Sequence, residues 1–517
     1  MTTRPTLHGT FGMVSSTHWL ASQSAMAELE AGGNAFDAAV AGAFVLHVVE
    51  PHLNGPGGEV PAVFTTATDP TPTVLCGQGV APAGATSAYF RGLGLDLVPG
   101  SGPLAATVPG AVDAWLMLGQ DHGTRSLRDV LSYATGYARH GHPLLPRAAA
   151  TVATMEQLFS EQWPTSAARW IPHGRLPRPW ELVTNPAYAD VLDRLVATGE
   201  AASSARETQY AVARRAWREG FVAEAVDAFC RLPFQDSSGE AHCGVLTGAD
   251  LAAWNASYER PVTYRFRDFE IAKTDLWGQG PVLLQSLAML DRLPGASLDP
   301  SSIEGAHVAT EALKLAFADR EAWYGDGSPV SAADLLDPAY VEARLALVGD
   351  AASTDLRPGA PGGRTPRLSR HVLHESEAPE AVGLGEPTVS WTGETKGDTC
   401  HIDVVDRWGN LISATPSGGW LQSSPTVPEL GFCLGTRMQM FWLDDGLPSS
   451  LVPGHRPRTT LSPTLVLRDG APVYAVGTPG GDQQDQWQLV FLLRLLVLGQ
   501  ELQEAIDAPM FHTTSLP

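Results

Sequence analysis

The sequence contains little lysine and little positive charge. Lysine occurs only at positions 273, 314 and 396, and 34 lysines and arginines stand against 56 aspartates and glutamates. The formal net charge is −22 over 517 residues. Nucleic acids and anionic membrane surfaces are bound by positively charged faces. We therefore expect neither partner.

Cysteine is also scarce, and its spacing is uninformative. The five cysteines never form a C-x-x-C pair; they are Cys76, Cys230, Cys243, Cys400 and Cys433. Zinc sites and disulfide frameworks require close or regular cysteine spacing. We therefore expect no metal and no cofactor.

Long apolar segments are missing as well. The N-terminal residues contain no apolar signal segment, and no later run reaches membrane-spanning length. These features predict a cytoplasmic protein. With 44% hydrophobic and 17% charged residues, the chain has the composition of a globular protein with one large core or two domains.

A predicted hairpin near residue 400 organises the rest of the chain. Residues from about 352 to 398 are rich in Pro, Gly, Arg, Ser and Glu and have no regular period, which is typical of a linker. Alternation then begins at Thr399, and a turn around Trp408 leads into a second strand. This register places Thr399 opposite Ser417 and His401 opposite Thr415, about 4.5–5.5 Å apart between Cβ atoms.

A threonine in this position has the features of an N-terminal nucleophile. Thr399 heads a strand, follows a cleavable linker and faces hydroxyl groups, and its own freed amine would be the base. Other residues could take part. His52, His401 and His512 could relay protons, although a single histidine usually packs. Cys400 could attack, although a cysteine in a strand usually packs too.

A second hairpin precedes a candidate oxyanion site. Residues 462–467 and 473–476 alternate around an Asp-Gly turn, and a helix is predicted over 484–497. Between them lie Gly480 and Gly481, whose backbone N–H groups could stabilise a tetrahedral intermediate. A plain strand–helix turn is the alternative. Residues 482–486 could contact substrate or simply complement the helix dipole.

The remaining segments predict a mixed architecture. A first helix is expected to be capped by Ser16 or Thr17, and a second by Asn34. Residues 100–350 have mainly helical patterns, with one alternating strand at 260–266.

Several motifs resemble those of γ-glutamyltransferases, which belong to the N-terminal nucleophile (Ntn) hydrolases. The motifs are GGNAFDAAVA (32–41), VEPH (49–52), VPG (108–110), AFADR (316–320), TCH (399–401), VVD with GN (404–410), RPRTTLSPT (456–464) and GTPGG (477–481). They occur in the family's order over nearly the whole chain. The resemblance implies an α/β fold, the αββα sandwich, in which two stacked antiparallel sheets are flanked by helices.

The resemblance also implies maturation by self-cleavage between Asp398 and Thr399. Residues 1–398 would form the large subunit and 399–517 the small catalytic one. The two fragments would form a heterodimer, and this could in turn dimerise. Thr399 would be the nucleophile, and Gly480 and Gly481 the oxyanion donors. Thr415 and Ser417 occupy the Thr-x-Thr positions near the new amine.

The substrate-binding residues differ from the family's pattern. Gln78 stands where the family has a carboxylate-binding Arg, and Gly419, beside Trp420, where it has an amine-binding Asn. Arg437 and Met440 replace a Gln and its acidic partner, and Thr459 and Thr460 replace a serine pair. Trp420 and Gln422 could form pocket walls. Arg437 predicts an anionic substrate group, unless an internal acid such as Glu429 pairs with it.

These differences favour a substrate other than a γ-glutamyl group. Some members of the family act on oxamate-like amides or cleave an oxalyl-type group in antibiotic pathways. The resemblance thus implies an autoprocessing amidohydrolase or acyltransferase for a small anionic acyl amide or oxalyl-type substrate. A genuine γ-glutamyl hydrolase or transferase (glutathione hydrolase) and a catalytically inactive binding subunit remain as alternatives.

Overall fold

The computed structural model describes residues 2–374 and 399–513. Two antiparallel sheets form its centre. The six-stranded sheet has, in spatial order, β1 (Gly12–Ser16), β11 (Ile402–Asp406), β12 (Leu411–Ala414), β2 (Val60–Thr66), β3 (Asp69–Gly77) and β8 (Ser257–Glu259). The four-stranded sheet has β14 (Ala471–Val476), β13 (Thr464–Arg468), β10 (Phe269–Lys273) and β9 (Val262–Phe266).

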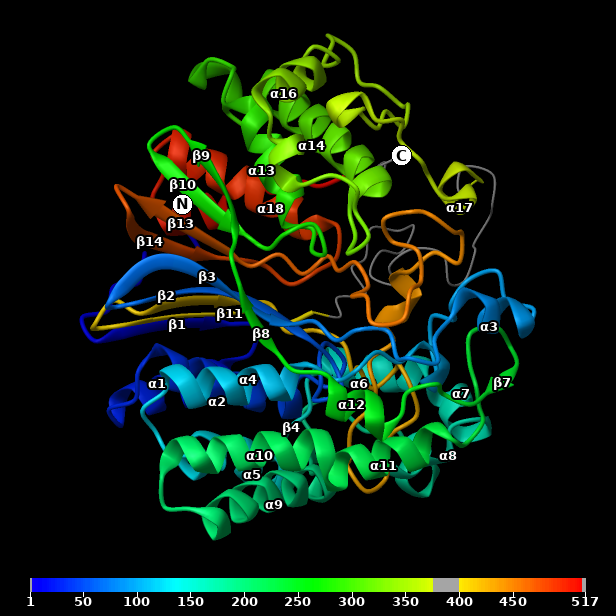
Figure 1. Cartoon of the computed structure of the whole chain (residues 1–517). Helices are drawn as coiled ribbons and strands as arrows, with labels where there is room; N and C mark the ends of the chain where they lie inside the picture. Colours follow the sequence, from blue (N-terminus) through cyan, green and yellow to red (C-terminus); the bar gives the residue numbers. More distant parts are fainter. Residues whose placement is uncertain (1, 375–398, 514–517) are drawn as a thin grey trace.

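Helices cover both outer faces of the stacked sheets (Figure 1). The four-stranded sheet is covered by α13 (Gly280–Leu290), α14 (Ile303–Trp323) and α18 (Gln483–Leu492). The six-stranded sheet is covered by α1 (Trp19–Glu30), α2 (Ala35–Val49) and α4 (Ala111–His122). Beyond these lie α5 (Leu127–His140), α9 (Pro186–Ala202), α10 (Arg206–Glu219) and α11 (Phe221–Cys230). The predicted αββα sandwich is confirmed.

Shorter elements connect these layers. The helices are α3 (Ser87–Gly92), α6 (Pro146–Thr154), α7 (Glu156–Glu161), α8 (Pro164–Trp170), α12 (Gly248–Ala253), α15 (Ala332–Leu335), α16 (Pro338–Leu345), α17 (Arg370–His374) and α19 (Leu502–Asp507). The strands are β4 (His142–Pro143), β5 (Leu182–Val183), β6 (Phe234–Gln235) and β7 (Ala241–His242). The chain also contains a 3₁₀ turn, η5 (Arg437–Met440), and a π-helical turn, η6 (Leu493–Val497).

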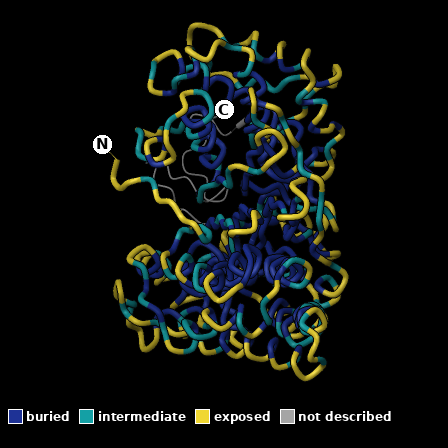
Figure 2. Tube along the Cα trace, turned by 90° about the vertical axis from the view of Figure 1, so that its left-hand side faces the viewer, coloured by how far each residue is buried: buried dark blue, intermediate teal, exposed yellow. Residues whose placement is uncertain are grey.

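Apolar side chains fill the space between the sheets. Val63, Val74 and Leu411 of the six-stranded sheet pack on Leu465 and Leu467 of the other. Buried residues follow the middle layers, and exposed ones lie on the outer loops (Figure 2). Within residues 2–374 and 399–513, no helix is long and apolar enough to cross a membrane.

The first two helices differ in how well the sequence predicted them. Asn34 caps α2 as expected, through hydrogen bonds to the backbone of Phe36 and Asp37. The predicted cap of the first helix is wrong. Residues 12–16 pair with β11, so the chain stays extended and His18 becomes the cap, accepting from the N–H of Leu20.

The hairpin register is confirmed. Ile402 pairs with Ala414, and an isolated antiparallel bridge joins Thr399 to Ser417. The second hairpin also forms, with Asp469 and Gly470 at positive φ of 52° and 78° as a two-residue turn requires. Both strands of the first hairpin lie inside the six-stranded sheet, between β1 and β2.

One buried carboxylate ties this hairpin to α2. Asp406 accepts hydrogen bonds from the backbone N–H groups of Ala35, Trp408, Gly409 and Asn410 at 2.9–3.1 Å. It also accepts from the Asn410 amide at 2.6 Å. The two carboxylate oxygens of Asp406 therefore bind both the N-terminus of α2 and the hairpin turn.

We predict that Asp406→Ala lowers the free energy of unfolding by about 2–4 kcal/mol, because several donors to a charged acceptor lose their partner together. Urea denaturation followed by circular dichroism measures this. Asp268→Ala is the control, since Asp268 is an exposed acid at the β9–β10 turn with no hydrogen bond among the described residues. Equal stability of the two variants would contradict the prediction.

Candidate active site

The start of the hairpin forms a buried group of hydroxyls. The side chain of Thr399 is only 2% exposed, and its Oγ1 lies 3.2 Å from Oγ of Ser417. The backbone is held on both sides, because Cys400 donates to the carbonyl of Pro416 and Thr17 donates to that of His401. The structure thus brings together the two hydroxyls that the register predicted. Asp398 lies outside the described residues.

The ring of His401 contacts the hydroxyl of Thr415, the residue that the register predicted to lie opposite it. Its Nδ1 lies 3.0 Å from Oγ1 of Thr415, and its Nε2 lies 2.9 Å from Oδ1 of Asp403. The ring packs so closely on Gly477 that a Cβ there would lie 2.0 Å from the ring. His401 therefore fixes the loop that leads to Gly480, and both of its ring nitrogens already have partners.

The other two histidines show no relay geometry. His52 is buried, and neither ring nitrogen has a hydrogen-bond partner within the described part of the chain. Burial lowers the pKa of His52 to about 3, so the ring is neutral at physiological pH. His512 contacts the edge of the Trp487 ring.

Arg437 is paired with an internal acid, which changes its expected role. Its Nε donates to Oε1 of Glu59 at 2.6 Å, and its Nη2 donates to Oγ of Ser417 at 3.1 Å. Both charged side chains are buried. The prediction that Arg437 binds a substrate anion assumed that it had no internal partner. An internal pair is present, with Glu59 in place of Glu429, and binding of a substrate anion by Arg437 stays a prediction.

The glycine pair lies at the start of α18, as predicted. Gly480 has a φ of 113°, which glycine adopts readily. The N–H of Gly481 donates to Oε1 of Gln483 at 3.1 Å, so this donor has an internal partner that an oxyanion would displace. The amide of Gln484 donates to the carbonyl of Gly480. The loop geometry is thus held by its own helix.

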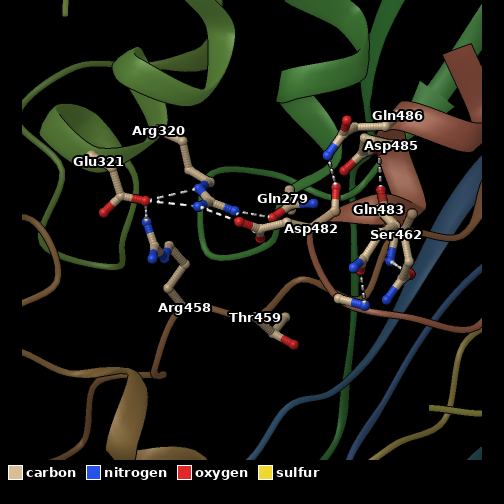
Figure 3. Close-up of polar contacts among 12 residues, drawn as sticks. Gln279, Arg320, Glu321, Arg458, Thr459, Ser462, Asp482, Gln483, Asp485 and Gln486 are labelled. Atoms are coloured by element: carbon tan, nitrogen blue, oxygen red, sulfur yellow. Dashed lines mark hydrogen bonds and ion pairs between the residues drawn. The ribbon is translucent and has the colours of Figure 1, made fainter. Parts of the chain in front are cut away.

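A network of ion pairs supports the loop that contains Gly480 and Gly481 (Figure 3). The guanidinium of Arg320, on α14, binds both carboxylate oxygens of Asp482, the residue after the glycine pair. Glu321 accepts from Arg320 and from Arg458, each at 2.8 Å. Although burial opposes it, these two positive charges hold the pKa of Glu321 down at about 2.

Arg458 connects these ion pairs to Thr459 and Thr460, two of the predicted substrate-binding residues. It directly precedes Thr459 and Thr460, both of which are buried. The backbone N–H of Thr459 donates to the carbonyl of Trp277 at 3.1 Å. Figure 3 shows Thr459 beside Arg458, at the edge of the ion-pair cluster. Sequence reasoning used Arg320 and Arg458 only as parts of the AFADR and RPRTTLSPT motifs, and it missed Glu321.

Three further predicted residues are Gln78 and the neighbours Gly419 and Trp420. Gln78 is fully buried, and neither polar atom of its amide has a hydrogen-bond partner within the described residues. Gly419 has a φ of 66° and packs on Gly57 and Gly58. Trp420 donates from Nε1 to the carbonyl of Leu53 at 2.9 Å, and its ring lies 5.5 Å from the Arg437 guanidinium carbon.

The thiol of Cys400 contacts the side chains of Glu50 and Asn54. Its Sγ lies 3.0 Å from Oε2 of Glu50, and the Asn54 amide donates to the same sulfur at 3.1 Å. Burial, together with the neighbouring Glu50, raises the pKa of the thiol. A protonated, buried thiol is a poor nucleophile. The interpretation that Cys400 packs is favoured.

The stacked antiparallel sheets with helices on both faces define the class: this is the fold of the Ntn hydrolases. The sequence profile described as Gamma-glutamyltranspeptidase matches residues 21–517. The chain belongs to that family, whose members are hydrolytic and acyl-transferring enzymes.

Curated relatives include differently named enzymes. The glutathione hydrolase-like YwrD proenzyme of Bacillus subtilis is 30% identical over 504 residues, covering 97% of this chain and 85% of the relative. The oxamate amidohydrolase proenzyme of Klebsiella pneumoniae is 30% identical over 513 residues, covering 97% and 84%.

Solved structures agree with this assignment. A threonine-to-alanine variant of a protein named LmbA2991 is 58% identical, with a TM-score of 0.94 over 100% of this chain and 87% of that one. A cephalosporin acylase from Bacillus halodurans is 25% identical, with a TM-score of 0.81 over 99% and 86%.

We predict that Cys400→Ser retains the activity of the protein within about threefold, because the hydroxyl can still donate to Glu50 and the thiol is not needed as a nucleophile. Iodoacetamide should alkylate the partly exposed Cys243 and leave Cys400 unmodified. Peptide mass spectrometry with parallel activity assays measures both. Inactivation that follows alkylation of Cys400 would contradict the prediction.

Proposed function

We propose that the chain is a proenzyme that cleaves itself between Asp398 and Thr399 and then uses Thr399 as its nucleophile. The observation that carries the proposal is the buried Thr399–Ser417 hydroxyl pair, 3.2 Å apart at the start of an internal hairpin. Relatives named proenzymes, at 30% identity over nearly the whole chain, support it.

Self-cleavage requires no external reagent except water. Oγ1 of Thr399 attacks the backbone carbonyl carbon of Asp398, the C–N bond breaks, and the proton lost by Oγ1 passes to the nitrogen, which gives an ester and a free amine. Water then hydrolyses the ester, leaving a carboxylate on Asp398 and an N-terminal Thr399. In turnover, the amine takes the proton from Oγ1 as the oxygen attacks the substrate's acyl carbon. The amine then protonates the leaving group, and water or an acceptor amine releases the acyl group.

Neighbouring groups take supporting roles in this proposal. Ser417 orients Oγ1 of Thr399, and Thr415 is held near it by His401. The N–H groups of Gly480 and Gly481 stabilise the oxyanion once the Gln483 side chain has moved aside. The ion pair between Arg320 and Asp482 keeps that loop in place.

The two products of cleavage would remain associated. Strands β11 and β12 of fragment 399–517 lie between β1 and β2 of fragment 1–398, and β13 pairs with β10. Separation would break the ladders of both sheets and expose the core between them. We therefore propose a heterodimer of the two fragments. A dimer of this heterodimer stays a prediction.

The substrate proposed is a small anionic acyl amide or oxalyl-type compound. The loop after Gln78 lies beside the segment that leads to Thr459, since the N–H of Ala81 donates to the carbonyl of His455 at 2.8 Å. Gln78, Thr459 and Thr460 would then supply neutral polar groups, and Gly419 and Trp420 the opposite wall. The neutral amide of Gln78 lacks the guanidinium that the family's Arg would offer to the α-carboxylate of a glutamyl group, which disfavours that group, and the hydroxyls of Thr459 and Thr460 would hydrogen-bond the anion of a shorter substrate.

The maturation step is tested with Thr399 variants. Wild-type protein should give two masses, the smaller equal to residues 399–517. Thr399→Ala should remain a single chain without turnover, because no hydroxyl is left to attack. Thr399→Ser is the matched control and should still be cleaved, more slowly. Intact-mass spectrometry over time measures this, and an intact wild-type chain with full activity would refute the proposal.

The substrate class is tested by exchanging Gln78. Wild-type protein should hydrolyse oxamate in preference to a γ-glutamyl anilide. Gln78→Arg should raise kcat/KM for the γ-glutamyl anilide about tenfold, since it restores a charged donor for the α-carboxylate. Gln78→Met controls for the loss of the amide. A wild-type preference for the γ-glutamyl anilide would favour the alternative, glutathione hydrolase activity.

A further inference from the structure

We infer that Glu59 and Arg437 form a positioning pair that orients Ser417 as a hydrogen-bond donor to the nucleophile. This inference rests on the proposed function, because it takes Thr399 as the attacking residue. It assigns a role to Glu59, which lies 340 positions before Thr399 in the chain, and it gives Arg437 a role other than substrate binding.

The pair is well placed to act on Ser417. Oε1 of Glu59 lies 2.6 Å from both Nε and Nη2 of Arg437, and Nη2 also reaches Oγ of Ser417 at 3.1 Å. Both side chains are almost completely buried, with exposed fractions of 1% and 3%. A buried charge without its partner is strongly unfavourable. The two residues therefore fix each other's positions.

The backbone holds Glu59 and Ser417 in register. The N–H of Glu59 donates to the carbonyl of Ser417 at 2.9 Å, and the N–H of Ser417 donates back at 3.0 Å. Gly418 follows at a φ of 74°, and a Cβ at that position would lie 2.4 Å from Oε2 of Glu59. Glycine is thus required for the carboxylate to lie beside Ser417.

The guanidinium is also held from a third side. The turn η5 begins at Arg437, and the ring of Trp420 lies 5.5 Å from its guanidinium carbon. Aromatic faces attract such cations. A carboxylate, a hydroxyl and a ring thus surround the same side chain, and its geometry is set before any substrate binds.

The direction of the hydrogen bonds gives the pair its function. A guanidinium has only donors, so Oγ of Ser417 accepts from Arg437. Oγ of Ser417 lies 3.2 Å from Oγ1 of Thr399, so the inferred arrangement has Ser417 donate its hydroxyl hydrogen to Thr399. Thr399 accepts this bond, and its own hydroxyl hydrogen passes to its nitrogen, which is the free amine in turnover and the departing nitrogen of the Asp398–Thr399 bond in self-cleavage. The same arrangement serves self-cleavage and turnover, since both begin with attack by Oγ1.

This role and a substrate-binding role predict different kinetics. If Arg437 held a substrate anion, its loss would raise KM and leave self-cleavage intact. As a positioning residue, its loss lowers kcat and slows self-cleavage, while KM stays nearly constant. Misplacement of a reacting group by about 1 Å costs up to about 100-fold in rate.

The experiment compares the wild type with Arg437→Met, Arg437→Lys and the double variant Glu59→Met with Arg437→Met. The double variant removes both charges together, which a folded core usually tolerates, so misfolding does not obscure the result. Arg214→Met is the matched control, because it breaks an ion pair between Arg214 on α10 and the buried Asp113 on α4, on the outer side of the six-stranded sheet. Self-cleavage is followed by intact mass, and turnover by steady-state kinetics on oxamate and a γ-glutamyl anilide, with thermal melting as a check of folding.

We expect Arg437→Met and the double variant to lose about 10- to 100-fold in self-cleavage rate and in kcat, with KM changed by less than about threefold. Arg437→Lys should recover part of this loss, and Arg214→Met should process and turn over normally. Wild-type rates in a folded double variant, or a loss confined to KM, would overturn the inference and leave the proposed function standing. A wild-type chain that neither cleaves itself nor turns over either substrate would overturn both.

Discussion

The insertion of one hairpin into the middle of the six-stranded sheet is the constraint on which the rest of the structure depends. β11 and β12 are flanked on both sides by strands from the first part of the chain. Strand pairing has a period of two, so the register that buries Ile402 and Val404 also places Thr399 against Ser417. Helix α2 packs on the same strands and shares Asp406 with their turn. The core and the hydroxyl pair are therefore specified together.

Buried ion pairs assemble the remainder of the site. Arg437 pairs with Glu59, Arg320 with Asp482, and Arg458 with Glu321. Each pair joins a residue before position 375 to one after position 398. Such pairs are poor sources of stability, because desolvation offsets their attraction, but an unmatched member is costly. They favour one arrangement of the two parts of the chain, and this arrangement sets the positions of Ser417 and of the glycine loop.

The comparison with relatives fits a conserved chemistry with a variable binding site. The chain belongs to the gamma-glutamyltranspeptidase family, and its relatives carry names as different as glutathione hydrolase, acylase and oxamate amidohydrolase. The resemblance of the sequence motifs implies that the strand start and the glycine pair follow the family's pattern and that Gln78, Gly419 and Arg437 depart from it. An enzyme can change its substrate by changing side chains around a fixed nucleophile, since the fold alone does not determine the substrate.

The sequence by itself determined the local features: the two hairpins, the Asn34 cap, the register of Thr399 with Ser417 and the glycine pair before α18. These follow from periods, turns and caps that involve neighbouring residues. Only the tertiary structure decided that residues 12–16 join the sheet, which moves the cap of α1 from Ser16 or Thr17 to His18, and that Arg437 pairs with Glu59, 378 positions away. Partners so far apart in the chain leave no local pattern, because the distance between them is set by the packing of the whole sheet.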